Sequence, residues 1–275
     1  MQIKDKLILI TGASSGIGAA TAQAAARAGG RVVLVARTQA ALEAVAAEIR
    51  AAGGQAWVYA ADLANPLQVA QMAVRVAREA GLPDIIVNSA GAGRWLFIEE
   101  TSAEEALEMM AAPYFTAFYT TRAFLPAMLA RGSGQIVVIN SPAARAVWPG
   151  ATGYTAARWA LQGFTQALRA DLYGTGLSVT SVVPARVLSP YFDHNPGSLE
   201  RAPGLARLIP DLTSAQVAEG VLWATAHNRR EHVMPAMLRV LYTLHWLAPG
   251  LMEWLVVRTG WQRPERPAAK RSGDV

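Results

Sequence analysis

TGASSGIG, residues 11–18, lies between a short apolar run, LILI (7–10), and an alanine-rich stretch of helical length (16–28). Its glycines permit a tight turn and a close approach of the backbone to a pyrophosphate. The helix that follows would present free N–H groups and a positive dipole end to that phosphate. Ordinary strand-to-helix turns also contain glycine, but the T-G-x3-G-x-G spacing after the first strand is more specific. The stretch therefore predicts a dinucleotide site that contains Gly12, Ser14, Ser15, Gly16, Ile17 and Gly18.

Apolar runs that are typical of buried parallel strands recur along the chain. After LILI they are RVVLVA (31–36), AWVYA (56–60), DIIVN (84–88), QIVVIN (135–140) and LSVTSVV (177–183). Amphipathic stretches of helical length, such as 39–52 and 66–80, lie between them. This alternation predicts the α/β class, with a Rossmann-like doubly wound parallel sheet that carries helices on both faces.

We expect a single domain, because the chain shows neither an internal repeat nor an interdomain linker. Residues 1–235 are predicted to form its dinucleotide-binding and catalytic part. Residues 236–261 are predicted to form an apolar C-terminal helical extension. The remaining residues, 262–275, are predicted to form a basic, disordered tail.

Composition excludes several classes of function. Hydrophobic residues make up 52% of the 275 residues and charged residues 16%, so the chain can bury a large core. The absence of cysteine excludes disulfides and thiolate metal sites, and the four histidines are scattered, so we expect no metal site. The net charge of +5 is small and lies partly in the tail, which argues against a nucleic-acid partner. The N-terminus, MQIKDKLILI, lacks the features of a signal peptide, so we expect a cytoplasmic protein.

The end of the second apolar run indicates which dinucleotide is bound. A carboxylate about 20 residues after the glycine loop would bond the ribose 2′-hydroxyl of NAD, whereas an arginine accommodates the 2′-phosphate of NADP. The run ends in Ala36, where the acid is expected, and Arg37 follows it. An arginine here could also simply cap the end of a strand. The missing carboxylate together with the added base favours NADP(H).

Several motifs in this order resemble those of the short-chain dehydrogenase/reductase family, over residues 5–235. TGASSGIG resembles the family's cofactor loop, and Asp62-Leu63 after the third strand resembles its adenine-pocket pair. Asn88-Ser89-Ala90-Gly91 resembles the family's Asn-Asn-Ala-Gly, which steadies the central sheet. The resemblance implies cofactor-binding roles for Asp62, Leu63, Asn88, Ala90, Gly91, Tyr154 and Arg158.

The family's chemistry needs four groups, and the sequence keeps two of them. A tyrosine exchanges a proton with the substrate oxygen while hydride moves to or from the nicotinamide, and a serine bonds the same oxygen. A lysine holds the nicotinamide ribose and favours the ionised tyrosine, and an asparagine holds a water behind the lysine. Ser141, 13 residues before Tyr154, matches the spacing of the family's serine and tyrosine. Arg158 stands at the lysine position, in GYTAARWALQGF (153–164), and Pro113 stands at the asparagine position.

Both departures fall on the lysine and asparagine positions, which by the family resemblance link the tyrosine to solvent for proton exchange. Ser141 and Tyr154, which would touch the substrate, are present. Arg158 retains a permanent positive charge, but its planar fork is longer than an ammonium and does not release a proton. Pro113 removes a backbone N–H and kinks a helix. The family's Pro-Gly after the sixth strand also reads Pro184-Ala185 here, which could reshape the backbone near the nicotinamide.

These residues predict an NADP(H)-dependent oxidoreductase that interconverts a carbonyl and a secondary alcohol on an apolar substrate. Tyr154 would be the acid/base, Ser141 would polarise the substrate oxygen, and Arg158 would stand in for the lysine. The alternative is a non-catalytic NADP(H)-binding protein with a sensing, structural or membrane-surface role. The loss of the asparagine–lysine pair favours that alternative.

The stretch from about 189 to 212 is rich in proline and glycine and has no clear periodicity. By the family resemblance it forms a mobile lid, in which Tyr191, Phe192, Leu205 and Leu208 could line an apolar pocket. Ordinary loop packing is the competing interpretation. The resemblance also implies a late helix over 214–226 and a final strand over 231–235.

The apolar extension, 236–261, goes beyond the family's minimal core. It contains Trp246, Trp254 and Trp261 and is broken by Pro249-Gly250, so each half is too short for the roughly 20 residues of a membrane-spanning helix. A peripheral contact with a membrane surface, a contact with a partner subunit and a cover over the substrate pocket are three open interpretations. By analogy with the family, a homodimer or homotetramer is expected to form through 113–130 and 154–172.

Overall fold

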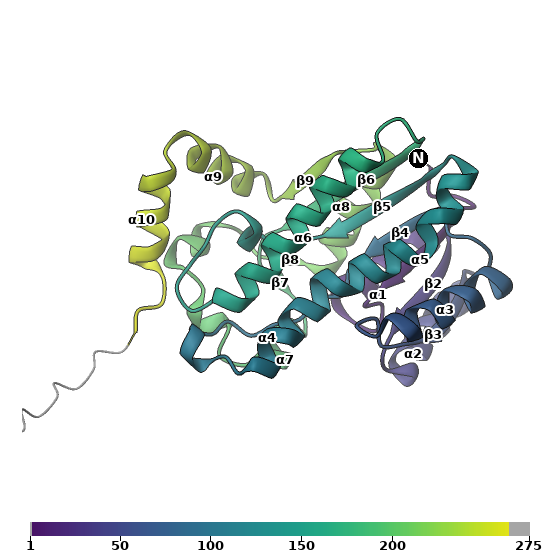
Figure 1. Ribbon diagram of the computed structural model, residues 1–275, viewed down its shortest axis with the longest axis horizontal. Coiled ribbons are helices and arrows are strands. Elements are labelled where there is room, and N and C mark those ends of the chain that lie inside the picture. Colours follow the sequence, from purple (N-terminus) through teal and green to yellow (C-terminus); the bar gives the residue numbers. More distant parts are fainter. Residues whose placement is uncertain (1, 264–275) are drawn as a thin grey trace, which may run out of the picture.

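A seven-stranded parallel sheet forms the centre of the molecule (Figure 1), in a computed structural model that describes residues 2–263. The strand order is β3-β2-β1-β4-β5-β6-β9. The strands are β1 (Leu7–Thr11), β2 (Arg31–Ala36), β3 (Gln55–Ala60), β4 (Ile85–Asn88), β5 (Gly134–Ile139), β6 (Leu177–Pro184) and β9 (Glu231–Met234). The predicted Rossmann-like α/β fold is confirmed, and each of the six predicted apolar runs agrees with a strand to within one residue at either end.

Both faces of the sheet are buried, which explains why its strands read as continuous apolar runs. Successive side chains of a strand point to opposite faces. Ile8 and Ile10 therefore join one core with α1 (Gly16–Arg27), α2 (Gln39–Ala51) and α8 (Ser214–Ala226). Leu7 and Leu9 join the other core with α3 (Pro66–Glu79), α5 (Thr116–Arg131) and α6 (Thr152–Asp171).

The order of the strands reverses at β1, which pairs with β2 on one side and with β4 on the other. The connections that leave the carboxyl ends of β1 and β4 run in opposite directions, so a crevice lies between them. In doubly wound sheets this switch point is where ligands bind. The glycine loop after β1 lies at this crevice.

The helix that contains Pro113 is distorted, as the sequence predicts. It begins as α4 (Ala103–Met110), continues through a single wider π-helical turn at Ala111–Phe115 and ends as α5. Proline has no N–H to donate within the helix. A π-helical turn is one way in which the backbone hydrogen bonds of a helix accommodate that missing donor. Pro113 itself is buried.

The segment after β6 is ordered in short elements. It contains β7 (Val187–Leu188), α7 (Tyr191–His194), η4 (Leu199–Arg201), η5 (Gly204–Leu208) and β8 (Leu212–Thr213). Two further short helical turns are η1 (Ile98–Glu100) and η3 (Pro142–Ala144). We call residues 189–212 the lid segment.

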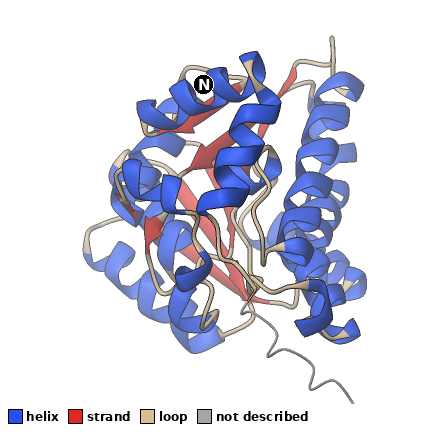
Figure 2. Ribbon diagram, turned by 90° about the vertical axis from the view of Figure 1, so that its left-hand side faces the viewer, coloured by secondary structure: helices blue, strands red, loops and turns tan. Residues whose placement is uncertain are grey.

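The apolar extension forms two helices, α9 (Ala236–Leu247) and α10 (Pro249–Thr259), with the break at the predicted Pro249-Gly250. They lie at one end of the molecule, on the left in Figure 1, and Figure 2 views the molecule from that side. None of the helices in residues 2–263 is long and apolar enough to cross a membrane. Beyond Arg263, the predicted disordered tail lies outside the described residues, and the predicted oligomer remains a prediction.

Candidate cofactor and catalytic site

A cavity of about 1000 Å³ at the switch point brings together nearly all the residues singled out in the sequence. It extends from the glycine loop to the inner sides of α9 and α10. The predicted site residues in its wall are Gly12, Ser14, Ser15, Gly16, Ile17, Gly18, Arg37, Asp62, Leu63, Ala90, Gly91, Ser141, Tyr154 and Arg158. Asn88 is the exception. It is buried behind the wall, where its side-chain amide donates to Thr121 Oγ1 at 3.3 Å and ties β4 to α5.

The glycine loop is shaped by contacts that leave no room for side chains. A Cβ on Gly12, which has a φ of 65°, would lie 2.9 Å from the Cα of Ala90, and a Cβ on Gly18 would overlap the carbonyl oxygen of Gly12. Thr11 fixes the neighbouring turn, because its Oγ1 accepts from the backbone N–H groups of Ser89 and Ala90 at 3.0 and 3.1 Å. The loop therefore presents backbone directly to the crevice.

Arg37 and Asp62 lie at the ends of β2 and β3, on the outer part of the cavity. Arg37 is exposed, and within the described residues its guanidinium makes no hydrogen bond or ion pair. Asp62 is held in a turn, since its Oδ1 accepts from Ala64 N at 3.0 Å and its own N–H donates to Gln68 Oε1 at 2.8 Å. The guanidinium of Arg37 is thus available to an anionic ligand at this end.

Arg158 is buried in the opposite half of the cavity, with only 7% of its surface exposed. Nη1 approaches the carbonyl of Ile139 at 3.5 Å, and Nε has no hydrogen-bond partner among the described residues. No carboxylate pairs with it anywhere in residues 2–263. It lies against Gly91, where an added Cβ would be 2.8 Å from Nη2. A buried cation without a counter-ion is costly, so this group favours a ligand with acceptor oxygens.

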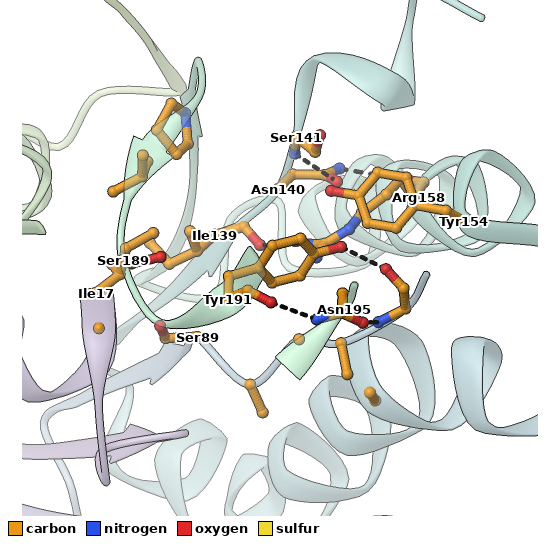
Figure 3. A pocket seen from close by; sticks show the side chains of 18 of the residues that line it. Ile17, Ser89, Ile139, Asn140, Ser141, Tyr154, Arg158, Ser189, Tyr191 and Asn195 are labelled. Atoms are coloured by element: carbon orange, nitrogen blue, oxygen red, sulfur yellow. Dashed lines mark hydrogen bonds between the residues drawn. The ribbon is translucent and has the colours of Figure 1, made fainter. Parts of the chain in front are cut away.

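Tyr154 and Ser141 face the same part of the cavity (Figure 3). The guanidinium carbon of Arg158, one helical turn along α6, is 5.0 Å from the centre of the Tyr154 ring. Ser141 lies two residues after β5, immediately before η3, and its Oγ accepts from Ala143 N at 3.3 Å while its N–H donates to Asn140 Oδ1 at 2.9 Å. Asn140 in turn donates to Gln162 Oε1 and to the carbonyl of Arg158. Sequence reasoning missed Asn140, which ties the serine-bearing strand end to α6.

Aromatic side chains from three separate segments surround Tyr154. The ring of Trp95 lies 5.8 Å from that of Tyr154, 5.1 Å from Trp148 and 6.0 Å from Phe192. The ring of Tyr191 lies 6.4 Å from that of Tyr154. We call these five residues the aromatic cluster. Tyr191 and Phe192 were among the sequence candidates, but Trp95 and Trp148 lie in loops without any pattern that could have indicated them.

The lid segment is tied to the loop after β4 by a set of hydrogen bonds (Figure 3). Tyr191 donates from its hydroxyl to the carbonyl of Gly93 at 2.5 Å, and Asn195 Oδ1 accepts from the N–H of Gly93 at 3.1 Å. Ser198 Oγ accepts from the N–H of Trp95 at 2.9 Å. Burial, and to a smaller extent the nearby Tyr154, raises the pKa of Tyr191, so its hydroxyl stays protonated and continues to donate.

Three of the four predicted pocket-lining residues of the lid segment reach the cavity. Tyr191, Phe192 and Leu205 line it. Leu208 does not, and with 65% of its surface exposed this prediction is wrong. It ends the short turn η5, where its side chain points to solvent.

A carboxylate outside the cavity also holds the lid segment, and it predicts a dependence on pH. Glu100 accepts two hydrogen bonds from the guanidinium of Arg201, and these, with the N–H of Phe97, lower the pKa of Glu100 from 4.5 to about 2. A depressed pKa stabilises the folded contact above pH 4.5, and the stabilisation is lost as pH falls from about 4.5 toward 2. We expect the protection factors for hydrogen exchange of residues 189–212 to fall over this range.

Glu100→Gln should show faster exchange at neutral pH and a smaller further change on acidification. Glu99→Gln is the matched control, because Glu99 pairs with the exposed Arg263 beyond the lid segment. Identical exchange in Glu100→Gln and the unsubstituted protein would show that this ion pair does not hold the lid segment.

The fold and the site together define a class: an α/β protein whose switch-point cavity accepts a dinucleotide next to a tyrosine, a serine and a buried cation. The family model described as short chain dehydrogenase matches residues 6–196. An uncharacterized oxidoreductase of Bacillus subtilis, YxnA, is 30% identical over 275 residues, covering 98% of this chain and 77% of its own. The uncharacterized oxidoreductase Rv1543 of Mycobacterium tuberculosis is 36% identical over 238 residues, covering 85% of this chain and 67% of its own.

Solved structures agree with this assignment. A short chain dehydrogenase/reductase from Burkholderia phymatum in complex with NAD superposes with a TM-score of 0.81 at 26% identity, covering 98% of this chain and 99% of its own. A short-chain dehydrogenase from Sphingobium yanoikuyae in complex with NADPH gives a TM-score of 0.78 at 26% identity, covering 97% and 99%. The chain belongs to the short-chain dehydrogenase family of oxidoreductases, whose fold binds a nicotinamide cofactor.

Proposed function

We propose that the protein is an NADP(H)-dependent oxidoreductase that interconverts a carbonyl and a secondary alcohol on an apolar substrate. One observation carries the proposal: Tyr154, Ser141 and a buried, carboxylate-free Arg158 share a cavity wall with the glycine loop. A purely structural arginine would be expected to have its donors satisfied by the protein. Arg158 instead keeps Nε free within the described chain.

The cavity fits a nicotinamide dinucleotide on its own chemistry. The glycine loop and the first turn of α1 would hold the pyrophosphate, because unpaired N–H groups at a helix N-terminus bind phosphate. Arg37 would hold a 2′-phosphate, and Arg158 would donate to ribose hydroxyls at the other end. The bound cofactor would supply or accept a hydride.

The residues of this chain would manage the proton and the substrate oxygen. The Tyr154 hydroxyl would donate its proton to the oxygen as a carbonyl is reduced, or receive it as an alcohol is oxidised. Ser141 would donate a second hydrogen bond to that oxygen and so favour the negative charge that develops on it. The fixed charge of Arg158 would favour the phenolate left on Tyr154. Because a guanidinium keeps its protons, reprotonation of Tyr154 would have to reach it by a route other than Arg158.

The surroundings of Tyr154 favour an apolar substrate. The other four residues of the aromatic cluster surround it. Leu205 of the lid segment, Leu238 of α9 and Val256 of α10 continue the cavity wall. Tyr242 also lines this part, and its hydroxyl is buried with no partner among the described residues. Burial raises the pKa of Tyr242, so it would meet a substrate as a neutral hydroxyl. The substrate would thus be largely apolar, with room for one additional polar group.

Replacing Arg37 by alanine tests the preference for NADP(H). A hydrogen bond to a charged group contributes about 1.5–3 kcal/mol, so the affinity for NADPH should fall about 10- to 100-fold. The affinity for NADH, which has no 2′-phosphate, should hardly change. Calorimetric titration of both cofactors measures the two constants. Arg27→Ala, which removes the same charge from the exposed last turn of α1, is the matched control. An equal loss for both cofactors would contradict the assigned role of Arg37.

The whole proposal is tested with a panel of ketones, aldehydes and quinones and a second protein that carries both Pro113→Asn and Arg158→Lys. Oxidation of NADPH by the unsubstituted protein with an apolar carbonyl is the expected result. The non-catalytic alternative, which Arg158 and Pro113 favour, predicts a different outcome. In that case NADPH binds to both proteins and neither protein oxidises it.

A further inference from the structure

We propose that α9 and α10 hold the protein against an anionic lipid surface and that the cavity receives its substrate from that surface. The first part is inferred from the exposed apolar and basic side chains of the two helices. The second part rests on the proposed function, because it concerns how an apolar substrate reaches Tyr154.

The outer faces of α9 and α10 carry an unusual concentration of exposed apolar side chains. Of the 22 large apolar residues that are exposed in the described chain, nine fall between 237 and 261. The largest exposures among them are Trp246 at 79%, Leu247 at 63%, Trp254 at 59% and Leu251 at 57%. Trp246 and Leu247 precede the Pro249 break and Leu251 and Trp254 follow it, so both helices contribute to this apolar patch. Soluble proteins rarely gather so many large apolar side chains on one exposed region without an interaction partner.

The inner faces of the same helices belong to the cavity. Leu238, Leu241, Tyr242 and His245 of α9 line it, and Met252 and Val256 of α10 complete this wall. In each helix the lining residues recur at a spacing of three or four, which places them on one side. The two helices are therefore a single layer between the substrate end of the cavity and the exterior.

Helix α10 also contacts the lid segment. Gly204, at the start of η5, packs against Thr259 closely enough that an added Cβ would lie 3.3 Å from its side chain. Gly260, just after α10, packs against Pro149 beside the aromatic cluster residue Trp148. Helix α10 and the residue after it thus contact both the lid segment and the loop that carries Trp148. A displacement of α10 by a bound surface would therefore move segments that surround Tyr154.

Charge favours an anionic surface as the occupant of the patch. Arg239 and Arg258 are exposed and pair with no carboxylate among the described residues, whereas Arg263 pairs with Glu99. Glu253 is the single acidic residue in the sequence from 236 to 263. Tryptophan and arginine next to an apolar stripe are typical of helices that lie in a membrane interface, and each of these helices is too short to span one. A second copy fits less well, because a two-fold contact would place the same excess of arginines against itself.

Sedimentation with vesicles of equal parts phosphatidylcholine and phosphatidylglycerol tests the first part without any turnover. The full-length protein should partition into the pellet, and less so with phosphatidylcholine alone or at high salt. Trp246→Ser, Leu251→Ser and Trp254→Ser combined should lower the partition coefficient at least about tenfold, since three large apolar side chains are lost from the face that would enter the interface. Unchanged NADPH affinity would show that this variant is folded.

A matched triple variant elsewhere on the surface provides the control. Leu67, Val74 and Tyr173 are at least as exposed, and their replacement by serine should leave vesicle binding unchanged. Absence of the unsubstituted protein from anionic pellets, or equal binding by both triple variants, would overturn the proposal. So would a fall in oligomer mass caused only by the Trp246, Leu251 and Trp254 changes, because the patch would then be a subunit interface.

The second part is tested by turnover in two settings. The Trp246, Leu251 and Trp254 triple variant should reduce a small water-soluble ketone at the unsubstituted rate and lose most of its rate on a long-chain ketone dissolved in the vesicles. Equal rates on the vesicle-dissolved ketone would overturn entry from the surface. If neither protein reduces either ketone, the proposed function fails, while the sedimentation result still decides whether the patch binds lipid.

Discussion

Tyr154→Phe is expected to remove nearly all turnover while leaving the affinity for NADPH within about twofold. The substitution removes one hydroxyl and keeps the ring that packs against Trp95, Tyr191 and Arg158. The expected loss is about 10²- to 10⁴-fold, the range that general acid–base groups supply. Steady-state rates with the best ketone of the panel, together with calorimetric NADPH affinity, measure the two quantities.

Tyr191→Phe is the matched control, because it removes a second hydroxyl from the same cavity. That hydroxyl is bonded to the carbonyl of Gly93, so its loss should loosen the lid segment and raise KM more than it lowers kcat. A tenfold or smaller effect of Tyr154→Phe on kcat would contradict the acid/base role. A large effect of Tyr191→Phe on kcat with a small effect of Tyr154→Phe would assign the proton to Tyr191.

Arg158→Met is expected to lower both turnover and cofactor affinity. The methionine fills part of the same buried space but removes a positive charge 5.0 Å from the Tyr154 ring. Because the phenolate formed on Tyr154 during proton transfer would then lack a neighbouring cation, kcat should fall by about tenfold or more. The donors available to ribose hydroxyls disappear at the same time, so NADPH affinity should fall as well.

Arg158→Lys should keep turnover within about tenfold of the unsubstituted protein or raise it, since the charge remains. Arg169→Met on the same helix is the control: Arg169 bonds the carbonyls of Val179 and Arg230 away from the cavity, so its loss should lower thermal stability and leave NADPH affinity unchanged. If Arg158→Met binds NADPH and turns over like the unsubstituted protein, the cation has no part in the reaction.

The local sequence determined the fold because the relevant signals extend over few residues. A parallel strand buried on both faces is a continuous apolar run, so β2 was predicted with its observed ends. Four of the other runs differ from their strands by one residue at one end, and the run for β5 differs by one residue at both ends. The bounds of α8, 214–226, were also predicted as observed. The glycine loop could be recognised because only glycine fits where backbone meets backbone, as Gly12 does against Ala90.

The glycine loop and the family resemblance indicated the positions of the principal site residues, but not their environments. The family resemblance predicts that Arg158 stands at the position of a lysine, but not that its guanidinium is buried against Gly91 without a carboxylate partner among the described residues. It also gave no sign that Gly93 and Asn195, 102 residues apart, are hydrogen-bonded. Such contacts depend on which loops meet at the carboxyl edge of the sheet, and loop residues have no periodicity from which this could be derived.

By itself, the sequence determined the class of fold, the order of its strands and helices, and the residues that lie at the switch point. The tertiary structure alone decided what surrounds Tyr154 and which sides of α9 and α10 face the cavity. The reason is physical. The buried face of a strand or helix can be predicted from the spacing of apolar residues within that element, whereas the walls of a cavity come from segments that are far apart in the chain. Trp95, Trp148 and Tyr191 meet around Tyr154 only because the sheet brings the ends of their strands together.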